Sequence, residues 1–272
     1  MEYQIQRGDE LCHVIHRHEP PVLMMKDDNH GLIVYEDEHI IAVDKVPTIP
    51  IHPCGAYHFN TLLKTLPTAK NDVYPIHRLD RLTSGIVILA KSKQVATSLS
   101  SYFLQQQQQQ QQQQSICHKY YLARVHGQFP TSLTTIFNHT KKNNSNNYYW
   151  IQTNTGKRSS LDVYVTSPKH SIASVLQGSH EEDEGILWLY VNRSIRPSSF
   201  KDGTWNCCDN DADGKAAKTA FGIVSYDPKS HTTLVIAKPI TGRTHQIRLH
   251  LQYLGHSIIN DDLYPQTQNN TG

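Results

Sequence analysis

The chain lacks the features that would place it outside the cell or in a membrane. Its five cysteines form no Cys-x-x-Cys pair and are odd in number, which argues against a disulfide framework and favours a reducing compartment. Residues 1–19 have no apolar core and carry acids, so neither a secretory signal nor a clear transit peptide is visible. No apolar run approaches the length of a bilayer span. We expect an intracellular protein with no membrane partner and favour the cytoplasm, with mitochondrial or nuclear placement left open.

An excess of charge of one sign is also missing. The net charge of +2 over 272 residues does not by itself indicate nucleic-acid binding. Three histidines lie close together near the N-terminus, His13, His16 and His18. No cysteine or acid is spaced with them in a known ligand pattern, so we predict no metal site.

The length allows one large domain or two small ones. We expect an extension over residues 1–30, a main domain over 31–264 and a tail over 265–272. Low-complexity insertions interrupt the main domain at about 104–116 and 139–213. The first contains ten glutamines, Gln105–Gln114, whose small apolar surface predicts a disordered or helix-extending segment.

Short apolar runs separated by turn residues predict a domain rich in strands. Leu32–Lys45 contains two such runs around a polar turn, which is typical of a strand pair. Two amphipathic helices are expected, one capped by Ser92 and one capped by Thr244 and ended by Gly255. Few helices among hairpin-spaced strands indicate an α+β fold around a mixed, mostly antiparallel sheet. Further strands are expected in the runs LDVYV and ILWLYV, in Ile86–Ala90 (buried), and within His118–Gly127, Ala220–Tyr226 and Thr232–Lys238.

One acid stands out in the polar turn before the Ile86–Ala90 strand. Asp80 lies between Arg78 and Arg81, and flanking guanidinium groups favour the charged form of a carboxylate. An ionised carboxylate on a rigidly anchored loop suits a nucleophile or a base better than a proton donor. On these residues alone, however, a structural loop salt bridge is the commoner reason for such an arrangement.

Three strings in this chain resemble the signature motifs of the RluA-type pseudouridine synthases. HRLDRLTSG, from His77 to Gly85, is followed by an apolar strand and resembles the first of these strings. KYYLA, over residues 119–123, resembles the second motif of the family, and GRTHQIRLH, over residues 242–250, resembles the third. The resemblance covers about Gly31 to Tyr264 apart from the insertions.

The resemblance implies a fold, a reaction and a site. The fold is a twisted central sheet with flanking helices and a catalytic cleft, and the reaction converts a uridine in RNA to pseudouridine. Asp80 is implied as the catalytic aspartate, Arg248 as its ion-pair partner, and Tyr121 as the ring that stacks on the uracil and helps with the proton at C5. Asp80 either attacks C1′ or removes a proton from the sugar, and the sequence leaves both open. No cofactor or metal is required, because no redox change or external group transfer occurs.

RNA is the partner that the resemblance implies, and no protein partner is implied. Residues 8–22 resemble the segment before the catalytic domain in the eukaryotic branch of the family, which implies tRNA as the substrate, at a uridine of the anticodon loop. A base in a loop leaves its stack at a small cost. Arg78 is expected to fill the space left by the flipped base. The other residues assigned to RNA binding are Arg81, Lys119, Arg243 and His245.

One turn departs from the family's pattern. The family usually has a Lys-Pro-x-Gly turn where this chain has Lys45-Val46-Pro47-Thr48, which leaves the backbone of this loop and its RNA contacts open. The departure and the large insertions keep a second hypothesis, a catalytically inactive relative that binds RNA. A third hypothesis, a glycosidase-like hydrolase, needs a second acid, which neither the first string nor the third supplies.

Overall fold

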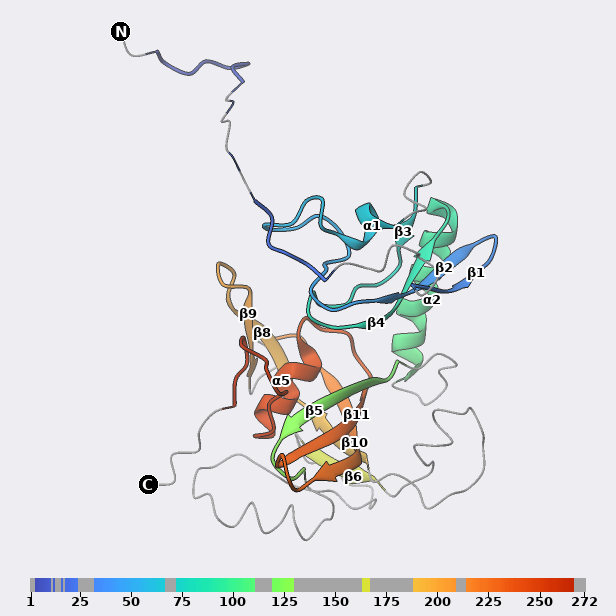
Figure 1. Cartoon of the computed structure of the whole chain (residues 1–272), viewed down its shortest axis with the longest axis vertical. Coiled ribbons are helices and arrows are strands. Elements are labelled where there is room, and N and C mark those ends of the chain that lie inside the picture. Colours follow the sequence, from blue (N-terminus) through green and yellow to red (C-terminus); the bar gives the residue numbers. More distant parts are fainter. Residues whose placement is uncertain are drawn as a thin grey trace. The chain divides into compact units, whose positions relative to one another are not determined.

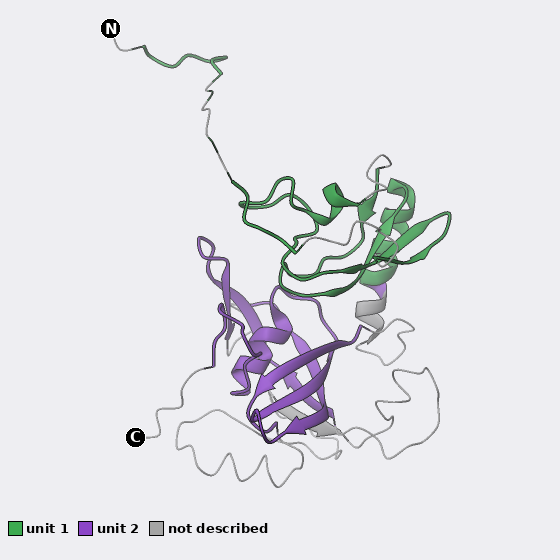
Figure 2. Ribbon diagram, in the orientation of Figure 1, with its two compact units in different colours: residues 1–104 green, residues 105–272 purple. Residues whose placement is uncertain are grey.

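The computed structural model describes residues 3–10, 12, 16, 18–23, 32–66, 72–110, 119–129, 163–166, 188–208 and 214–266. Figure 1 labels its helices and strands, and Figure 2 colours its two compact units, residues 1–104 and residues 105–272. The boundary between the units falls within helix α2 (Lys93–Gln110), and the domain bounds expected from the sequence stay predictions.

The first unit is built on a four-stranded antiparallel sheet with the order β1-β2-β4-β3. The strand pair predicted within Leu32–Lys45 is confirmed as β1 and β2. Its turn is closed by Asp37, whose carboxylate accepts hydrogen bonds from the backbone N–H groups of His39 and Ile40. The strands are β1 (Ile33–Glu36), β2 (Ile40–Lys45), β3 (Tyr74–Pro75) and β4 (Gly85–Ala90).

Strand β4 is the predicted apolar strand, but it is not buried along both faces. Val87 and Leu89, on one face, are completely buried, whereas Ile86 is 49% exposed. The expectation of a fully buried strand is therefore wrong at Ile86. The physical reason is that an antiparallel sheet needs apolar cover on one face only, so an apolar run does not prove burial on both.

Two helices complete the first unit. Helix α1 (Leu62–Thr65) is a single turn whose first N–H, on Leu62, donates to the Pro50 carbonyl at 2.8 Å. Helix α2 begins after Ser92, and the Ser92 hydroxyl accepts a hydrogen bond from the Val95 N–H, as predicted for a cap. The helix continues to Gln110, so the glutamine tract extends it, which was one of the two expected outcomes. The last glutamines of the tract lie outside the described residues.

The second unit contains a five-stranded sheet with the order β5-β11-β10-β7-β6, in which all neighbours are antiparallel. The strands predicted within this part of the chain are confirmed, and the LDVYV and ILWLYV runs contribute β6 and β7 to the same sheet. With few helices and antiparallel pairing among the described strands, the α+β prediction is confirmed. The strands are β5 (Tyr121–His126), β6 (Val163–Thr166), β7 (Trp188–Asn192), β10 (Lys218–Asp227) and β11 (Thr232–Pro239).

A second hairpin of this unit, β8 (Ser194–Ser199) and β9 (Thr204–Cys208), was not predicted. It lies within 139–213, where the polar sequence suggested an inserted loop. Only one buried apolar residue on each strand, Ile195 and Cys208, anchors the hairpin, so the alternation typical of a strand is absent from the sequence. Ile195 belongs to a small core cluster with Leu249 and Tyr264, which ties the hairpin to the rest of the unit.

Helix α5 (Gln246–Tyr253) packs against one face of the five-stranded sheet. Leu251 and Leu254 join the sheet's main core cluster, and Ile247 packs against it, as the predicted apolar stripe requires. Gly255 follows the helix with a φ of 76°, which confirms the predicted helix end. The predicted cap at Thr244 is wrong, because the cap residue is His245.

Neither a membrane span nor a metal cluster is found within the described ranges. Of the helices in these ranges, none combines the length and the apolar character needed to cross a membrane. No group of three or more His, Cys, Asp or Glu side chains in the same ranges is placed to hold a metal ion. His16 and His18 contact each other through their Nε2 atoms at 2.7 Å, and His13 lies outside the described residues.

Candidate active site

Asp80 lies in a turn that is fixed to the sheet of the first unit on both sides. The Thr83 N–H donates to the Asp80 carbonyl at 3.0 Å, which closes the turn, and Leu79 is buried just before it. At the start of the string, Nε2 of His77 accepts a hydrogen bond from the Ile88 N–H of β4 at 3.2 Å. The histidine and leucine of HRLD therefore anchor the backbone, and Asp80 is the half-buried acid that the turn presents.

Lys45, at the end of β2, supports the Asp80 turn, and the sequence did not predict this role. Its side chain is completely buried, and its ammonium group donates to the carbonyls of Val46 and Ile49 at 3.0 Å and of Arg81 at 3.2 Å. Since Arg81 directly follows Asp80, Lys45 ties the loop after β2 to the Asp80 turn. The only sequence signal was a lysine at the end of an apolar strand, where lysine is seldom fully buried.

Burial lowers the pKa of Lys45 from 10.5 to about 8, while the charge of Asp80 raises it and that of Arg81 lowers it. The interaction with Asp80 shows that the two charges act on each other within this unit.

The turn that departs from the family's pattern keeps a backbone conformation that glycine would favour. Thr48 stands where the family usually has glycine, and its φ is 78°. A β-branched residue in this left-handed region is strained. The Thr48 hydroxyl accepts a hydrogen bond from the Leu23 N–H at 2.7 Å, which attaches the N-terminal segment to the loop. The threonine thus adds a tether at a position where glycine could not.

The two arginines beside Asp80 are both exposed. The guanidinium group of Arg81 lies over the ring of Tyr57, with its carbon 5.6 Å from the ring centroid. This stacking joins the Asp80 turn to the loop before α1, a connection that the sequence did not indicate. The RNA-binding assignments of Arg78 and Arg81 stay predictions.

In the second unit, Tyr120 and Tyr121 lie on opposite faces of the sheet. Tyr121 packs against the main core cluster on the α5 side, whereas Tyr120 packs against the cluster on the other face. The ammonium group of Lys238 lies 5.7 Å from the Tyr120 ring centroid. Both tyrosines are partly buried, and so is Lys119 before them. The catalytic assignment of Tyr121 and the RNA-binding assignment of Lys119 stay predictions.

The glutamine of the third string holds the loop before α5. Gln246 is buried, and its Oε1 accepts hydrogen bonds from the Thr241 hydroxyl at 2.7 Å and from the Arg243 N–H at 3.0 Å. Its Nε2 donates to the Lys218 carbonyl at 3.0 Å and to the Thr219 hydroxyl at 2.9 Å. This side chain fixes the loop where a capping threonine was expected, which explains why the Thr244 prediction failed.

The two histidines of the same string also have structural partners. His250 is completely buried between the Thr219 hydroxyl, at 2.9 Å, and the Arg193 carbonyl, at 3.0 Å. Burial lowers the pKa of His250 to about 4, although the bond to Arg193 opposes the shift, so this histidine is neutral at pH 7. His245 lies at the start of α5 with a φ of 55°, and its Nδ1 is 2.7 Å from the Tyr264 hydroxyl.

Arg248 is held by an acid that lies just beyond the third string. Its Nε and one terminal nitrogen donate to the two carboxylate oxygens of Asp261, each at 2.7 Å. Its guanidinium carbon also lies 4.8 Å from the centroid of the Tyr264 ring. The pair is well shielded, since the Arg248 and Asp261 side chains are 17% and 7% exposed. The sequence analysis implied Asp80 as the ion-pair partner of Arg248 and did not identify Asp261.

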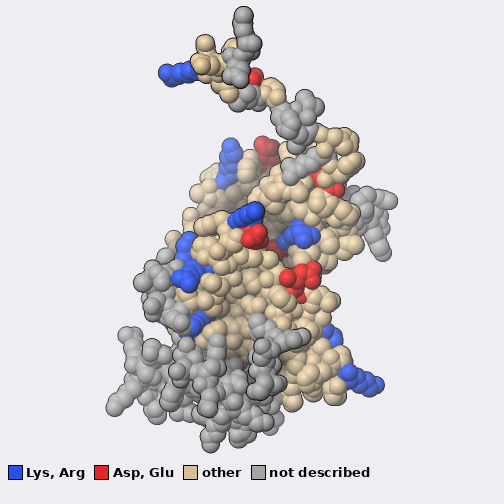
Figure 3. Space-filling model, turned by 90° about the vertical axis from the view of Figure 1, so that its left-hand side faces the viewer, with Lys and Arg blue, Asp and Glu red and all other residues tan. Residues whose placement is uncertain are grey.

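The basic residues in and just before the third string do not share one partner. Arg243 is exposed and its Nε donates to the Ala216 carbonyl at 3.1 Å, while Lys238 lies over Tyr120 and Arg248 is bound to Asp261. On the face drawn in Figure 3, the described Lys and Arg side chains are scattered among acidic and uncharged residues. The described basic side chains on this face therefore do not form one continuous patch.

The comparisons with known proteins agree with these strings. The family model described as RNA pseudouridylate synthase matches residues 39–253, which is most of the chain, so the chain belongs to this family. The resemblance to the RluA type is confirmed. The dual-specificity RNA pseudouridine synthase RluA of Vibrio parahaemolyticus is 28% identical over 85% of this chain and 68% of its own length.

Two further relatives show the similarity of sequence and of fold. The mitochondrial tRNA pseudouridine(32) synthase of Saccharomyces cerevisiae is 34% identical over 98% of this chain and 44% of its own length. The structure of human RNA Pseudouridylate Synthase Domain Containing 1 matches with a TM-score of 0.54 at 20% identity, over 90% of this chain and 74% of that one. The chain spans about half the length, between 35% and 55%, of the eukaryotic relatives that it matches.

Proposed function

We propose that this chain is an RNA pseudouridine synthase, which isomerises uridine to pseudouridine within RNA. The observation that carries the proposal is the Asp80 turn, because the family's acid stands on a backbone fixed by the buried Lys45 and by His77. Rigid anchoring of this kind allows a reacting group to be held in one orientation toward its substrate.

The proposed reaction breaks the bond between C1′ and N1, rotates the uracil and rejoins it to C1′ through C5. If Asp80 attacks C1′, a bond forms from its carboxylate oxygen while N1 leaves with the bonding electrons. If it acts as a base, it takes a proton from the sugar first. In the first case C5 then attacks C1′ and the bond from Asp80 to C1′ breaks, and in the second the sugar regains its proton. In either case C5 loses a proton and N1 gains one, and the Tyr121 ring stacks on the uracil during the rotation. Pairing of Arg248 with Asp80 stays a prediction.

We further propose that the target uridine lies in the anticodon loop of a tRNA. A flipped base is required, and unstacking is least costly where the nucleotide is not held in a duplex. The name of the yeast relative places its own target at tRNA position 32, and that relative aligns with 98% of this chain. An RNA substrate is consistent with an intracellular protein, and the cytoplasmic location stays a prediction.

The test is to compare Asp80→Asn with Asp44→Asn, an exposed acid of β2 in the same unit. Each protein is incubated with total tRNA, and pseudouridine is mapped by chemical labelling and primer extension. Asp80→Asn should abolish product and still bind the RNA, because asparagine has nearly the same shape, while Asp44→Asn should retain product. A wild-type protein that binds RNA but makes no pseudouridine would favour the inactive relative, and product from Asp80→Asn would exclude the proposed mechanism.

A further inference from the structure

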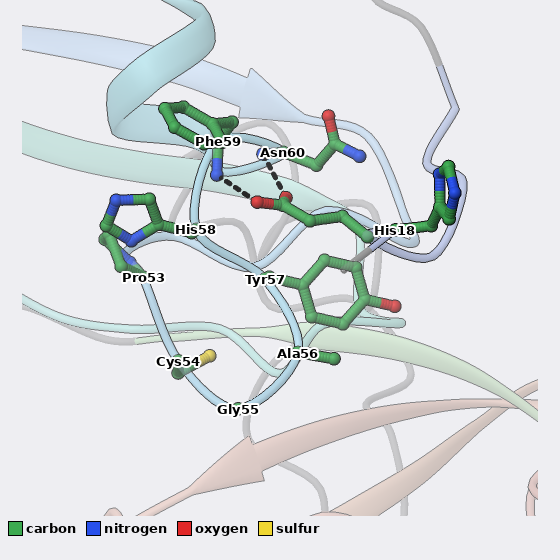
Figure 4. Close-up of a pocket in the computed structure, with 10 residues that line it drawn as sticks. His18, Pro53, Cys54, Gly55, Ala56, Tyr57, His58, Phe59 and Asn60 are labelled. Carbon is green, nitrogen blue, oxygen red and sulfur yellow. Dashed lines mark hydrogen bonds between the residues drawn. The ribbon is translucent and has the colours of Figure 1, made fainter. Parts of the chain in front are cut away.

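A hollow of about 700 Å³ lies in the first unit, next to the residues that contact the Asp80 turn. Its wall is the loop 53–60, together with His18 and Glu19 of the N-terminal segment. Figure 4 shows the loop bending through Gly55, with the side chains of Tyr57, His58 and Phe59 following along it. Because Tyr57 of this wall stacks under Arg81, the hollow is connected to the turn that carries Asp80.

The loop around the hollow is rigid in its backbone. Cys54 and Tyr57 exchange two hydrogen bonds between their N–H and carbonyl groups, each at 3.0 Å, which closes a tight turn. Gly55 within it has a φ of 56°, a conformation that glycine adopts without strain. The far end of the loop leads into α1, where Leu62 is completely buried. The backbone of this loop is therefore held in place without a ligand.

Glu19 fixes the other side of the same wall. Its two carboxylate oxygens accept hydrogen bonds from the N–H groups of Phe59, at 2.7 Å, and Asn60, at 2.8 Å, which Figure 4 draws as dashed lines. The Asn60 side chain donates in return to the Pro20 carbonyl at 3.2 Å. Burial alone raises the pKa of Glu19, but these hydrogen bonds outweigh it and lower the pKa, so the carboxylate is ionised.

The wall carries aromatic rings that the fold leaves open to solvent. Phe59 is 70% exposed, and its ring meets the His58 ring edge to face at 4.7 Å between centroids. A single exposed aromatic residue needs no explanation. Here, however, three residues with rings follow one another, Tyr57 to Phe59, on a closed loop that contacts the Asp80 turn. Such a group indicates a binding surface. Aromatic rings beside a basic group are the usual platform for unpaired bases.

We propose that this hollow binds a nucleobase of the RNA strand next to the target uridine. The inference rests on the proposed function, because it needs an RNA substrate at Asp80. The charge of Glu19 disfavours a phosphate in the hollow, whereas each of its oxygens can accept a second hydrogen bond from the N–H edge of a base. The exposed Phe59 ring supplies the stacking face, and the backbone of the bound strand passes the guanidinium group of Arg81.

The inference is tested by binding a synthetic anticodon stem-loop RNA that carries fluorescent aminopurine beside the target uridine. Measurements use the full chain with Asp80→Asn, so that the RNA is not modified during titration. Stacking on a protein ring quenches aminopurine, and the quench should be lost with Phe59→Ala and kept with Phe59→Trp. Phe59→Ala should weaken binding by about tenfold, because it removes one base–aromatic stack. The matched control is Tyr35→Ala, an aromatic residue of β1 that is 54% exposed.

The outcomes separate the two proposals. Equal affinity and equal quench for Phe59→Ala and Tyr35→Ala would overturn the base-binding site, and so would a wild-type chain that does not bind the RNA. Loss of the quench only with Phe59→Ala would support it. Failure of the proposed function appears elsewhere, as a wild-type protein that makes no pseudouridine while its quench still depends on Phe59.

Discussion

Replacing Asp261 by asparagine tests how the guanidinium group of Arg248 is held. In the wild type, both oxygens of Asp261 accept hydrogen bonds from Arg248 at 2.7 Å. One of these oxygens, Oδ1, also accepts from the backbone N–H groups of Leu263 and Tyr264, each at 3.2 Å. Asparagine keeps the shape of this acceptor but removes its charge and one of its two oxygens. The substitution therefore separates the ionic part of the contact from its packing.

The expected loss follows from the burial of the pair. Removing one partner of a buried ion pair costs about 3–5 kcal/mol, because the other charge is left uncompensated. Arg248 is 17% exposed, and the remaining oxygen of asparagine still accepts one hydrogen bond, so we expect a smaller loss of about 2–3 kcal/mol. For a chain of this size, such a loss lowers the melting temperature by roughly 5–10 °C.

The same contact predicts a dependence on pH. Burial alone raises the pKa of Asp261, but the hydrogen bond and charge of Arg248 and the backbone N–H groups outweigh it, and the pKa lies below its usual value of 3.8. A carboxyl group whose pKa is lowered by folding stabilises the protein fully above the unfolded pKa. That stability is lost as pH falls through the folded value. The difference between wild type and Asp261→Asn should therefore shrink as the pH is lowered below about 4.

The assay is thermal unfolding over a series of pH values, with Asp262→Asn as the matched control. Asp262 is the next residue and is exposed, so its substitution should change the melting temperature little. Asp261→Asn should also slow pseudouridine formation, because a loosened Arg248 is less well oriented. Equal melting temperatures for the two variants, or a difference that stays constant down to acid pH, would refute the reasoning.

Two other substitutions in the first unit test the buried lysine and the strained threonine. Lys45→Met should lower the free energy of unfolding by about 2 kcal/mol at neutral pH, because three carbonyl groups lose their donor. The pKa of Lys45 is about 8 in the folded protein against 10.5 in the unfolded chain, so the unfolded chain binds more protons between these pH values. The wild type should therefore become more stable relative to this variant as pH rises through that window, as measured by urea titration. Thr48→Gly should change stability by less than about 1 kcal/mol, because relief of the strained φ offsets the greater chain entropy of glycine. It should also speed amide exchange at Leu23, whose N–H loses its acceptor, and unchanged exchange there would count against the proposed tether.

The strands could be predicted because their signal is local. An apolar run bounded by turn residues is visible in the sequence at β4, and it was visible even in the middle of the polar stretch that contains β6 and β7. The β8–β9 hairpin gave no such signal, because its anchoring depends on Ile195 and Cys208 meeting Leu249 and Tyr264, which lie far away in the chain. The Thr244 cap failed for a related reason. Gln246 fixes the loop by hydrogen bonds to Lys218 and Thr219 of β10, and these contacts form only once the chain is folded.

The three strings mix two kinds of residue, and the structure separates them. His77, Gln246 and His250 are buried or partly buried, and each hydrogen-bonds to the backbone of a strand or of the residue that follows one. They place the Asp80 turn and helix α5 on their sheets. Substitution of these residues should therefore act through stability, and RNA binding and catalysis should fall together with folding. Asp80 and Phe59 should behave differently, since the turn and the loop that carry them are fixed by other side chains, Lys45 and Glu19. An Asp80→Asn protein that melts several degrees below the wild type would contradict this division of roles.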